Sequence, residues 1–255
     1  DDNNSLSTFQ TLIVSTATRV GMGNLVGVVA AISAGGAGAV FWMWVAAFVA
    51  MFLKYAETLL ALSTREQQGG QLHGGAMYYI RAAVHGRAGR VLAAAFAALC
   101  VLTSLTLGGV IQTSAAAGAL SAAFSVPPVA VGAVFALAAA LVLIRGLRGV
   151  ERVSAALIPF LCLAYTVLSL VAIFRGRGML PSAFAAIFRG AFSVKSGLFG
   201  VGGFLASGAL RYGVSRGLVS NEAGCGTSPI AHAASGVRDP AAEGLFGVLE
   251  VFVDT

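Results

Sequence analysis

The residues of this sequence best suited to bind a small polar ligand are Val20-Gly21-Met22-Gly23-Asn24. They lie in an apolar stretch, because no charged residue occurs between Arg19 and Lys54. Two glycines around one residue loosen a helix, which frees backbone N–H groups for a carboxylate and backbone carbonyls for a small dehydrated cation. The side-chain amide of Asn24 both donates and accepts hydrogen bonds, so it suits either ligand.

A second glycine-rich segment, Gly200-Val201-Gly202-Gly203-Phe204, interrupts a later apolar stretch in the same way. Gly203 and its neighbours let a ligand or another backbone approach, and Phe204 either forms an apolar wall or simply packs. For the first segment alone, the GxxxG spacing of Gly23 and Gly27 favours a close helix contact. Two interrupted helices reverse that preference, because non-helical backbone at membrane depth is tolerated only inside protein or beside a cavity. Such a pair predicts the substrate and ion site of a transporter.

Three further polar side chains fall within apolar stretches, namely Gln112, Glu250 and Asp254. A glutamine at membrane depth either bridges helices or faces a cavity, and the sequence favours neither. A carboxylate at that depth is costly unless it is paired or hydrated. The two acidic residues therefore predict either a cation pathway or a buried ion pair.

The composition excludes a water-soluble fold. Of the 255 residues, 58% are hydrophobic and only 10% are charged, whereas a soluble domain carries about 25% charged residues. The runs Val91–Ile144 and Val153–Phe174 contain no Asp, Glu, Lys or Arg, and they lack the alternation of barrel strands, so we expect an all-α polytopic membrane protein. The net charge of +6 comes from short basic clusters between apolar spans, which orient the chain in the lipid bilayer and do not indicate nucleic-acid binding.

Seven apolar helices are predicted from these runs and from the turn residues between them. Residues 64–90 are predicted as a loop with a short amphipathic piece at 77–84, and residues 179–192 as an interfacial helix. The seven helices are expected at 9–34, 39–63, 91–119, 127–144, 153–174, 196–219 and from 242 onward.

Five spans separate the start of the first interrupted helix from the start of the second, and an odd number inverts the second copy of a repeat. We therefore expect one complete five-helix repeat and the start of a second, inverted one. Residues 1–255 are expected to form a single transmembrane domain that is incomplete at both ends. Nine arginines in the loops on one side, against four basic residues on the other, place the N-terminal side in the cytoplasm.

Motifs typical of enzymes are rejected on their context. Gly213-Val214-Ser215-Arg216-Gly217 matches GxSxG, but it lies in a predicted helix and not between a strand and a helix. No strand precedes Gly21-Met22-Gly23, so it is not a dinucleotide-binding loop. His73 and His232 have no companions at metal-ligand spacing. We expect no enzyme activity and no organic cofactor.

Several strings resemble the alanine or glycine:cation symporter family, also called sodium:alanine symporters. The resemblance implies a leucine-transporter-type fold, with sodium as the coupling ion for uptake of alanine, glycine or a similar small neutral amino acid across the cell membrane, most simply by a monomer. The strings are Arg19–Gly27, Gly38–Val45, Lys54–Glu57, Gly74–Tyr79, Gly217–Ala234 and Glu250–Thr255.

The resemblance also implies roles for individual residues. Substrate contacts are expected at Gly21, Met22, Gly23, Asn24, Gln112, Gly203 and Phe204. Cation contacts are expected at the backbone of Ala17 and Val20 and at Asn24. A channel or a non-transporting amino-acid sensor built on the same helices is the alternative. A purely structural membrane subunit would leave both broken helices unexplained.

Overall fold

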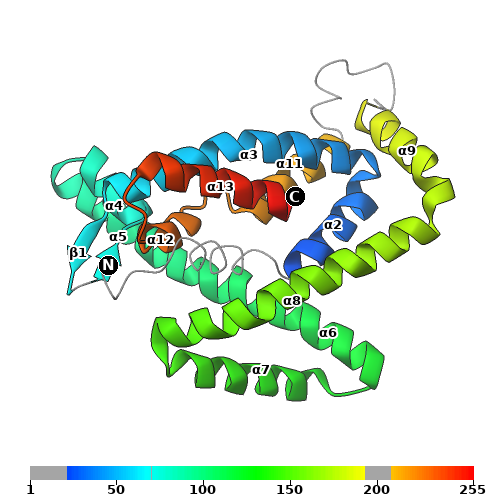
Figure 1. Ribbon diagram of the computed structural model, residues 1–255, viewed down its shortest axis with the longest axis horizontal. Coiled ribbons are helices and arrows are strands. Elements are labelled where there is room, and N and C mark those ends of the chain that lie inside the picture. The colour runs from blue at the N-terminus through cyan, green and yellow to red at the C-terminus, as the bar shows by residue number, and fades with distance from the viewer. Residues whose placement is uncertain (1–21, 70, 193–207) are drawn as a thin grey trace.

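The computed structural model describes residues 22–69, 71–192 and 208–255, and every structural statement below concerns these residues (Figure 1). One group of helices packs around α3 (Gly38–Ser63), which contacts each of the others. Its other members are α2 (Met22–Gly35), α11 (Gly208–Asn221), α12 (Ser228–Ala233) and α13 (Pro240–Asp254).

A second group of helices runs from the far end of the α3 group and returns to it (Figure 1). The stretch Gly86–Phe124 is helical throughout, with the π-helical turn η1 between two α-helices. Helix α9 then returns to α3, where the indole of Trp42 donates to the carbonyl of Ala191 at 3.0 Å. The elements are α5 (Gly86–Thr103), η1 (Ser104–Ile111), α6 (Gln112–Phe124), α7 (Pro128–Leu143), α8 (Gly146–Arg175), η2 (Arg177–Met179) and α9 (Leu180–Phe192).

A small hairpin lies in the segment predicted as a loop. Strands β1 (Glu66–Gln68) and β2 (Gln71–His73) pair antiparallel, with Glu66 opposite His73. Helix α4 (Ala76–Ala83) follows the hairpin and contains most of the predicted amphipathic piece. The prediction of an all-α protein is thus confirmed apart from this hairpin, while the leucine-transporter-type arrangement stays a prediction.

The predicted helix positions agree with α3, α7, α9 and α13 to within a few residues. Two helices begin earlier than predicted, α5 at Gly86 and α8 at Gly146. Both extensions contain arginines, whose long side chains can reach water from the end of a helix, so a charged residue does not end the helix. The glycine-rich segment at 200–204 lies outside the described residues, as does Gly21. Helix α2 begins at Met22, the residue after Gly21.

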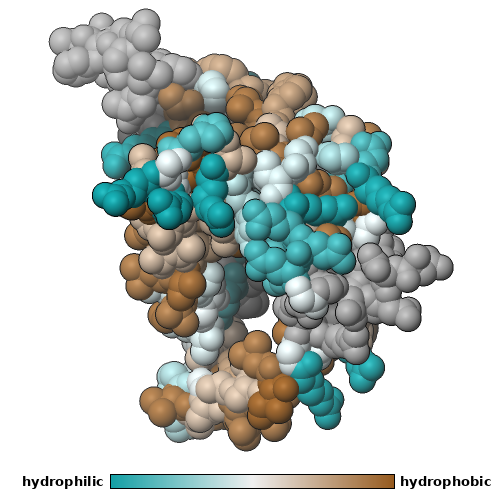
Figure 2. Space-filling model, turned by 90° about the vertical axis from the view of Figure 1, so that its left-hand side faces the viewer, coloured by the Kyte–Doolittle hydropathy of each residue, from teal (hydrophilic) through white to brown (hydrophobic). Residues whose placement is uncertain are grey.

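Within the described residues, three helical stretches are long and apolar enough to cross a membrane. They are 38–63, 86–124 and 152–175. Helices α7 and α8 expose many large apolar side chains, Val129 and Phe160 among them. Figure 2 shows hydrophilic residues gathered in a band, with hydrophobic residues covering most of the described surface below it. Apolar surface of this extent is unusual for a soluble protein and suits a protein embedded in lipid.

Helices α3 and α11 pack closely because small residues line their contact. A Cβ built on Gly213 would lie 2.4 Å from the carbonyl oxygen of Ala39, and one on Gly217 would lie 2.8 Å from the Cβ of Ala46. These two glycines belong to the rejected GxSxG string, so its spacing serves helix packing, as small-xxx-small patterns do in membranes.

We expect Gly213→Ala to destabilise the protein, because the added methyl would collide with the backbone of Ala39. Overpacking of this kind costs about 1–3 kcal/mol. The free energy of unfolding of the purified full-length protein in detergent, followed by denaturant titration, measures the loss. Gly118→Ala is the matched control, since a Cβ there meets nothing within 4 Å and alanine favours a helix. Equal stability of the two variants would contradict the close contact.

Candidate functional site

Asn24 lies in the first turn of α2 and joins two other helices. Its Nδ2 donates to Asp254 Oδ1 on α13 at 2.8 Å, and its Oδ1 accepts from Arg216 Nη2 on α11 at 3.1 Å. The second carboxylate oxygen of Asp254 accepts from Ser220 Oγ, also on α11, at 2.8 Å. We call these four residues, Asn24, Arg216, Ser220 and Asp254, the Asn24 junction.

A glycine makes room for the guanidinium of Arg216, the cationic member of the junction. A Cβ built on Gly27 would lie 1.9 Å from Arg216 Cζ, so any larger residue would displace the guanidinium. Arg216 and Ser220 are one helical turn apart on α11 and therefore lie on the same face. Gly23 and Gly27 have the GxxxG spacing of a close helix contact, and the structure shows that Gly27 accommodates a side chain from α11.

The junction balances its charges through an amide. Arg216 carries a positive charge and Asp254 a negative one, and Asn24 contacts both through opposite ends of its carboxamide. In a surrounding of low dielectric, each charge is costly without such a partner. Amide and carboxylate oxygens are also the ligands that hard cations prefer. The junction thus combines an anion, a cation and a neutral amide at the start of α2.

The predicted substrate and cation residues are only partly described by the structure. Met22 and Gly23 form the first turn of α2 together with Asn24. Gln112 begins α6, is half-buried, and lies on a helix that packs against α2, but it is not a member of the Asn24 junction. The remaining predicted residues lie outside the described part of the chain: Ala17, Val20, Gly21, Gly203 and Phe204.

Helix α13 directs Glu243 and Glu250 inward and most of its large apolar residues outward, with Val251 as a buried exception. Glu243 and Glu250 are buried, as are Gly244 and Gly247, whereas Leu245, Leu249, Phe252 and Val253 are exposed. Close packing on α3 accompanies this pattern, since a Cβ on Gly244 would meet the ring of Tyr55 at 2.7 Å. An arrangement with the polar face inside is expected where the surroundings are apolar.

The imidazole of His232 lies between the two buried carboxylates. Its Nδ1 is 2.8 Å from Glu243 Oε1, and its Nε2 is 3.0 Å from Glu250 Oε2. The exposed fractions of the three residues are 0%, 1% and 2%. Glu250 thus has a buried basic partner, as the ion-pair alternative for this residue requires.

The sequence predicted no companions at metal-ligand spacing for His232, and among the described residues no group of His, Cys, Asp and Glu is suited to a metal ion. The two carboxylates beside its imidazole were not predicted. The missed signal was the spacing of Glu243 and Glu250, which places two carboxylates on one face of a helix about two turns apart. Burial lowers the pKa of His232, but the hydrogen bonds with Glu243 and Glu250 outweigh burial and hold the pKa above its ordinary value.

Two basic residues extend this region along α3. Lys54 is fully buried, and its Nζ donates to the carbonyl of Glu222 at 3.4 Å. Arg65 follows the C-terminus of α3, and its guanidinium donates to the carbonyls of Ser235 and Val237, both at 2.8 Å. These contacts fasten the segments on either side of α12 to α3.

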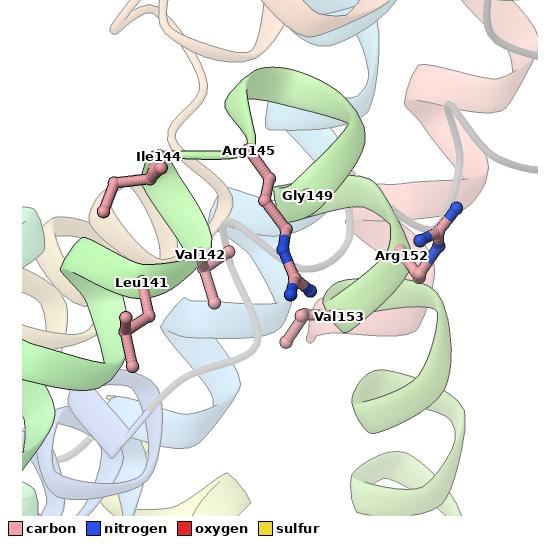
Figure 3. Close-up of a pocket in the computed structure, with 7 residues that line it drawn as sticks. All are labelled: Leu141, Val142, Ile144, Arg145, Gly149, Arg152 and Val153. Atoms are coloured by element: carbon pink, nitrogen blue, oxygen red, sulfur yellow. The ribbon is translucent and has the colours of Figure 1, made fainter.

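A separate hollow of about 640 Å³ lies at the turn between α7 and α8 (Figure 3). Arg145 and Arg152 contribute its basic side chains (Figure 3), and Met22, Gly23, Asn24 and Gln112, the predicted site residues that the structure describes, are not among its lining residues. The hollow is therefore not the site that the sequence predicted. We assign it no part in ligand binding.

Comparison with known proteins identifies relatives along the whole chain. The profile of the sodium:alanine symporter family matches residues 1–255. The chain is 36% identical over 253 residues to the sodium/alanine symporter AgcS of Methanococcus maripaludis, covering 98% of this chain and 55% of that protein. It is 40% identical to the uncharacterized transporter YaaJ of Escherichia coli, covering 98% of this chain and 52% of YaaJ. It is 37% identical to the amino-acid carrier protein AlsT of Bacillus subtilis, covering 100% of this chain and 53% of AlsT.

The chain thus spans about half the length of the curated relatives that it matches. The relatives' names describe transport proteins and carriers, in agreement with the prediction that the chain is no enzyme. The membrane-protein prediction is supported by the same comparisons and by the apolar helices.

A double-mutant cycle between Asn24 and Asp254 measures the bond on which the junction depends. We expect Asn24→Ala and Asp254→Ala together to destabilise the full-length protein by less than the sum of the single changes, with a coupling of about 1–2 kcal/mol. Thr255→Ala is the control partner, because Thr255 donates to Asn221 at 3.1 Å and not to Asn24. Its effect should add to that of Asn24→Ala within about 0.5 kcal/mol. Additive effects of Asn24→Ala and Asp254→Ala would show that the bond contributes nothing.

Proposed function

Because the chain belongs to the sodium:alanine symporter family, we propose that it is part of a secondary transporter that couples sodium entry to uptake of a small neutral amino acid. The observation that carries the proposal is the junction of α2, α11 and α13 at Asn24, directly after a glycine-rich segment. A polar cluster shared by three helices at the start of a helix is the kind of place where transporters bind substrate and ion.

The proposed architecture is the leucine-transporter-type inverted repeat, working by alternating access. Residues 1–255 would supply the first repeat and the start of the second, within one incomplete transmembrane domain. The protein would lie in the cell membrane as a monomer, with its N-terminal side in the cytoplasm. These assignments rest on the family, on the apolar helices and on the distribution of basic residues.

We assign the sodium contacts to the backbone of Ala17 and Val20 and to the amide oxygen of Asn24. The amino acid would contact Gly21–Asn24, Gln112, Gly203 and Phe204. N–H groups freed by the predicted break before α2 would suit the substrate carboxylate, since the positive end of a helix dipole would lie there.

Arg216 has a defined part in this proposal. Its guanidinium donates a hydrogen bond to the amide oxygen of Asn24 in the structure. A cation bound to the same oxygen would lie close to the guanidinium. Two like unit charges about 4 Å apart repel by about 4 kcal/mol at an effective dielectric constant of about 20. A bound cation therefore requires Arg216 to move away, while Asp254 stays to balance the charge. Cation binding at Asn24 and the Asn24–Arg216 bond are alternatives.

The competing functions are a channel and an amino-acid sensor on the same helices. Only a coupled transporter accumulates its substrate against a gradient and requires the sodium gradient to do so. Uptake into vesicles with and without a sodium gradient separates the three.

Asn24→Ala is expected to abolish concentrative, sodium-dependent uptake of labelled alanine by the full-length protein in proteoliposomes. The change removes the oxygen assigned to the cation and the amide bound to Asp254. Protein amount and orientation in the vesicles are measured in parallel. Gln68→Ala, which removes a side-chain amide from the exposed hairpin, should leave uptake unchanged. Normal uptake by the Asn24 variant would reduce Asn24 to a helix-packing residue.

Substrate size is expected to be limited by the glycine-rich segments together with Met22, Gln112 and Phe204. Glycine and alanine should compete best with labelled alanine, serine less well, and leucine or phenylalanine not at all. Each methylene that the pocket cannot accommodate costs about 1–3 kcal/mol, or roughly tenfold or more in affinity. Valine is the intermediate case, because a flexible methionine can fold aside. Equal inhibition by leucine and glycine would overturn the narrow pocket.

A further inference from the structure

The two contacts of His232 constrain how many protons the group can hold. A neutral imidazole has one N–H and one bare nitrogen, and a carboxylate only accepts hydrogen bonds. Both ring nitrogens lie within hydrogen-bond distance of a carboxylate oxygen, at 2.8 and 3.0 Å. Two such bonds require one proton more than neutral histidine and two carboxylates contain. That proton is either the second ring proton of an imidazolium or the proton of one carboxylic acid.

Burial makes this requirement strict. His232, Glu243 and Glu250 are all buried, so water cannot replace a missing hydrogen bond. Without the extra proton, a bare ring nitrogen would face a carboxylate oxygen at about 3 Å, and two lone pairs would repel. The second oxygen of Glu243 accepts a hydrogen bond from Ser235 Oγ at 3.2 Å.

We propose that His232, Glu243 and Glu250 form a proton-binding site that takes up one exchangeable proton and, when occupied, holds α12 against α13. The site is a second ion site, separate from the Asn24 junction, and its ligand is a proton and not a metal ion. A metal ion could not join the two carboxylates to one ring nitrogen, since they lie at opposite nitrogens of the imidazole.

The charges of the group change with the proton. With the proton bound, the site holds either an imidazolium and two carboxylates, or a neutral imidazole, one carboxylate and one carboxylic acid. Its net charge is −1 in both cases. Release of the proton to water leaves neutral histidine and two carboxylates, with a net charge of −2. Between α12 and α13, release removes one hydrogen bond of His232 and leaves a bare ring nitrogen facing a carboxylate oxygen, because His232 belongs to the first helix and both carboxylates to the second.

Other charged groups near α12 influence the site. On α3, against which α12 packs, they are Lys54 and Glu57, and Arg65 follows directly. The hairpin contributes His73, and Glu222 lies in the turn before α12. Positive charge on Lys54 and Arg65 favours the carboxylates and opposes the imidazolium, whereas Glu57 has the reverse effect.

The site is linked to the Asn24 junction through α13. Glu250 and Asp254 are one turn apart on that helix, so they lie on the same face. Glu250 contacts His232, and Asp254 contacts Asn24. A change in how α12 and α13 pack therefore reaches the residue that orients Asn24. This consequence for transport rests on the proposed function, whereas proton binding itself does not.

The test is the melting temperature of the purified full-length protein as a function of pH. A histidine with a raised folded-state pKa contributes stability that is complete below its ordinary pKa of about 6.5 and is lost as the pH rises through the folded-state value. The wild-type melting temperature should therefore be level in acid and fall above about pH 6.5. Glu250→Gln removes one carboxylate from the imidazole and should move the midpoint of this fall to lower pH by about one unit or more.

His232→Gln should abolish this part of the pH dependence, and His85→Gln, at an exposed histidine, should retain it. If His232→Gln does not fold, Glu243→Gln supplies a second midpoint shift in the same direction. The proton site would be overturned if the fall in melting temperature persisted unchanged in His232→Gln. It would also be overturned if the midpoint of the fall were unchanged in both Glu250→Gln and Glu243→Gln. A purely structural role would lower the melting temperature equally at every pH.

Alanine uptake measured over the same pH range separates the two proposals. We expect uptake by the wild type to change across the pH range in which the melting temperature falls, and this dependence to shift with Glu250→Gln. Absence of any uptake contradicts the proposed function and leaves the melting experiment decisive for proton binding. Uptake without a midpoint shift in either measurement contradicts the proton site alone.

Discussion

Three carboxylates on one short helix determine how the first group of helices is arranged. Glu243, Glu250 and Asp254 all lie on the inward face of α13, and each would be costly there without a partner. Their partners come from other elements: Glu243 and Glu250 share His232 of α12, and Asp254 contacts Asn24 of α2 and Ser220 of α11. The positions of α2, α11 and α12 follow from these contacts. In an apolar surrounding, hydrophobic burial cannot select one arrangement, because lipid is as apolar as a side chain; polar pairing can.

Glycines allow this pairing at close range. Gly244 and Gly247 bring α13 against α3, where Cβ atoms would meet the ring of Tyr55 at 2.7 Å and Oγ1 of Thr58 at 2.9 Å. Gly27 leaves space for the guanidinium of Arg216. At these three positions a glycine leaves room for a charged or bulky group of a neighbouring helix. The same glycines would weaken isolated helices, but here the contacts between helices compensate.

The sequence predicted the elements of this protein better than the contacts between them. Apolar runs located α3 and α7, since turn residues and prolines mark their ends. The starts of α5 and α8 were placed too late, because arginines were read as boundaries. The hairpin of β1 and β2 was missed, since Gln67–Gly75 has no apolar alternation to indicate strands.

At the candidate site, Asn24 and Asp254 were each recognised as unusual, but no local pattern shows that residues 230 positions apart in the chain share a hydrogen bond. At His232, metal-ligand spacing gives no signal, because a histidine that shares a proton with two carboxylates does not need that spacing.

The π-helical turn η1 gives the stretch Gly86–Phe124 two possible registers. A π-helix bonds each N–H to the carbonyl five residues earlier and therefore holds one residue more than the α-helix it replaces. Conversion of η1 to α-helical bonding would displace that extra residue and rotate everything after it by about 100°. Gln112 is the first residue after η1, and α6 packs against α2. Such a conversion would turn Gln112 relative to α2 by a change confined to one element, without unwinding the helix on either side.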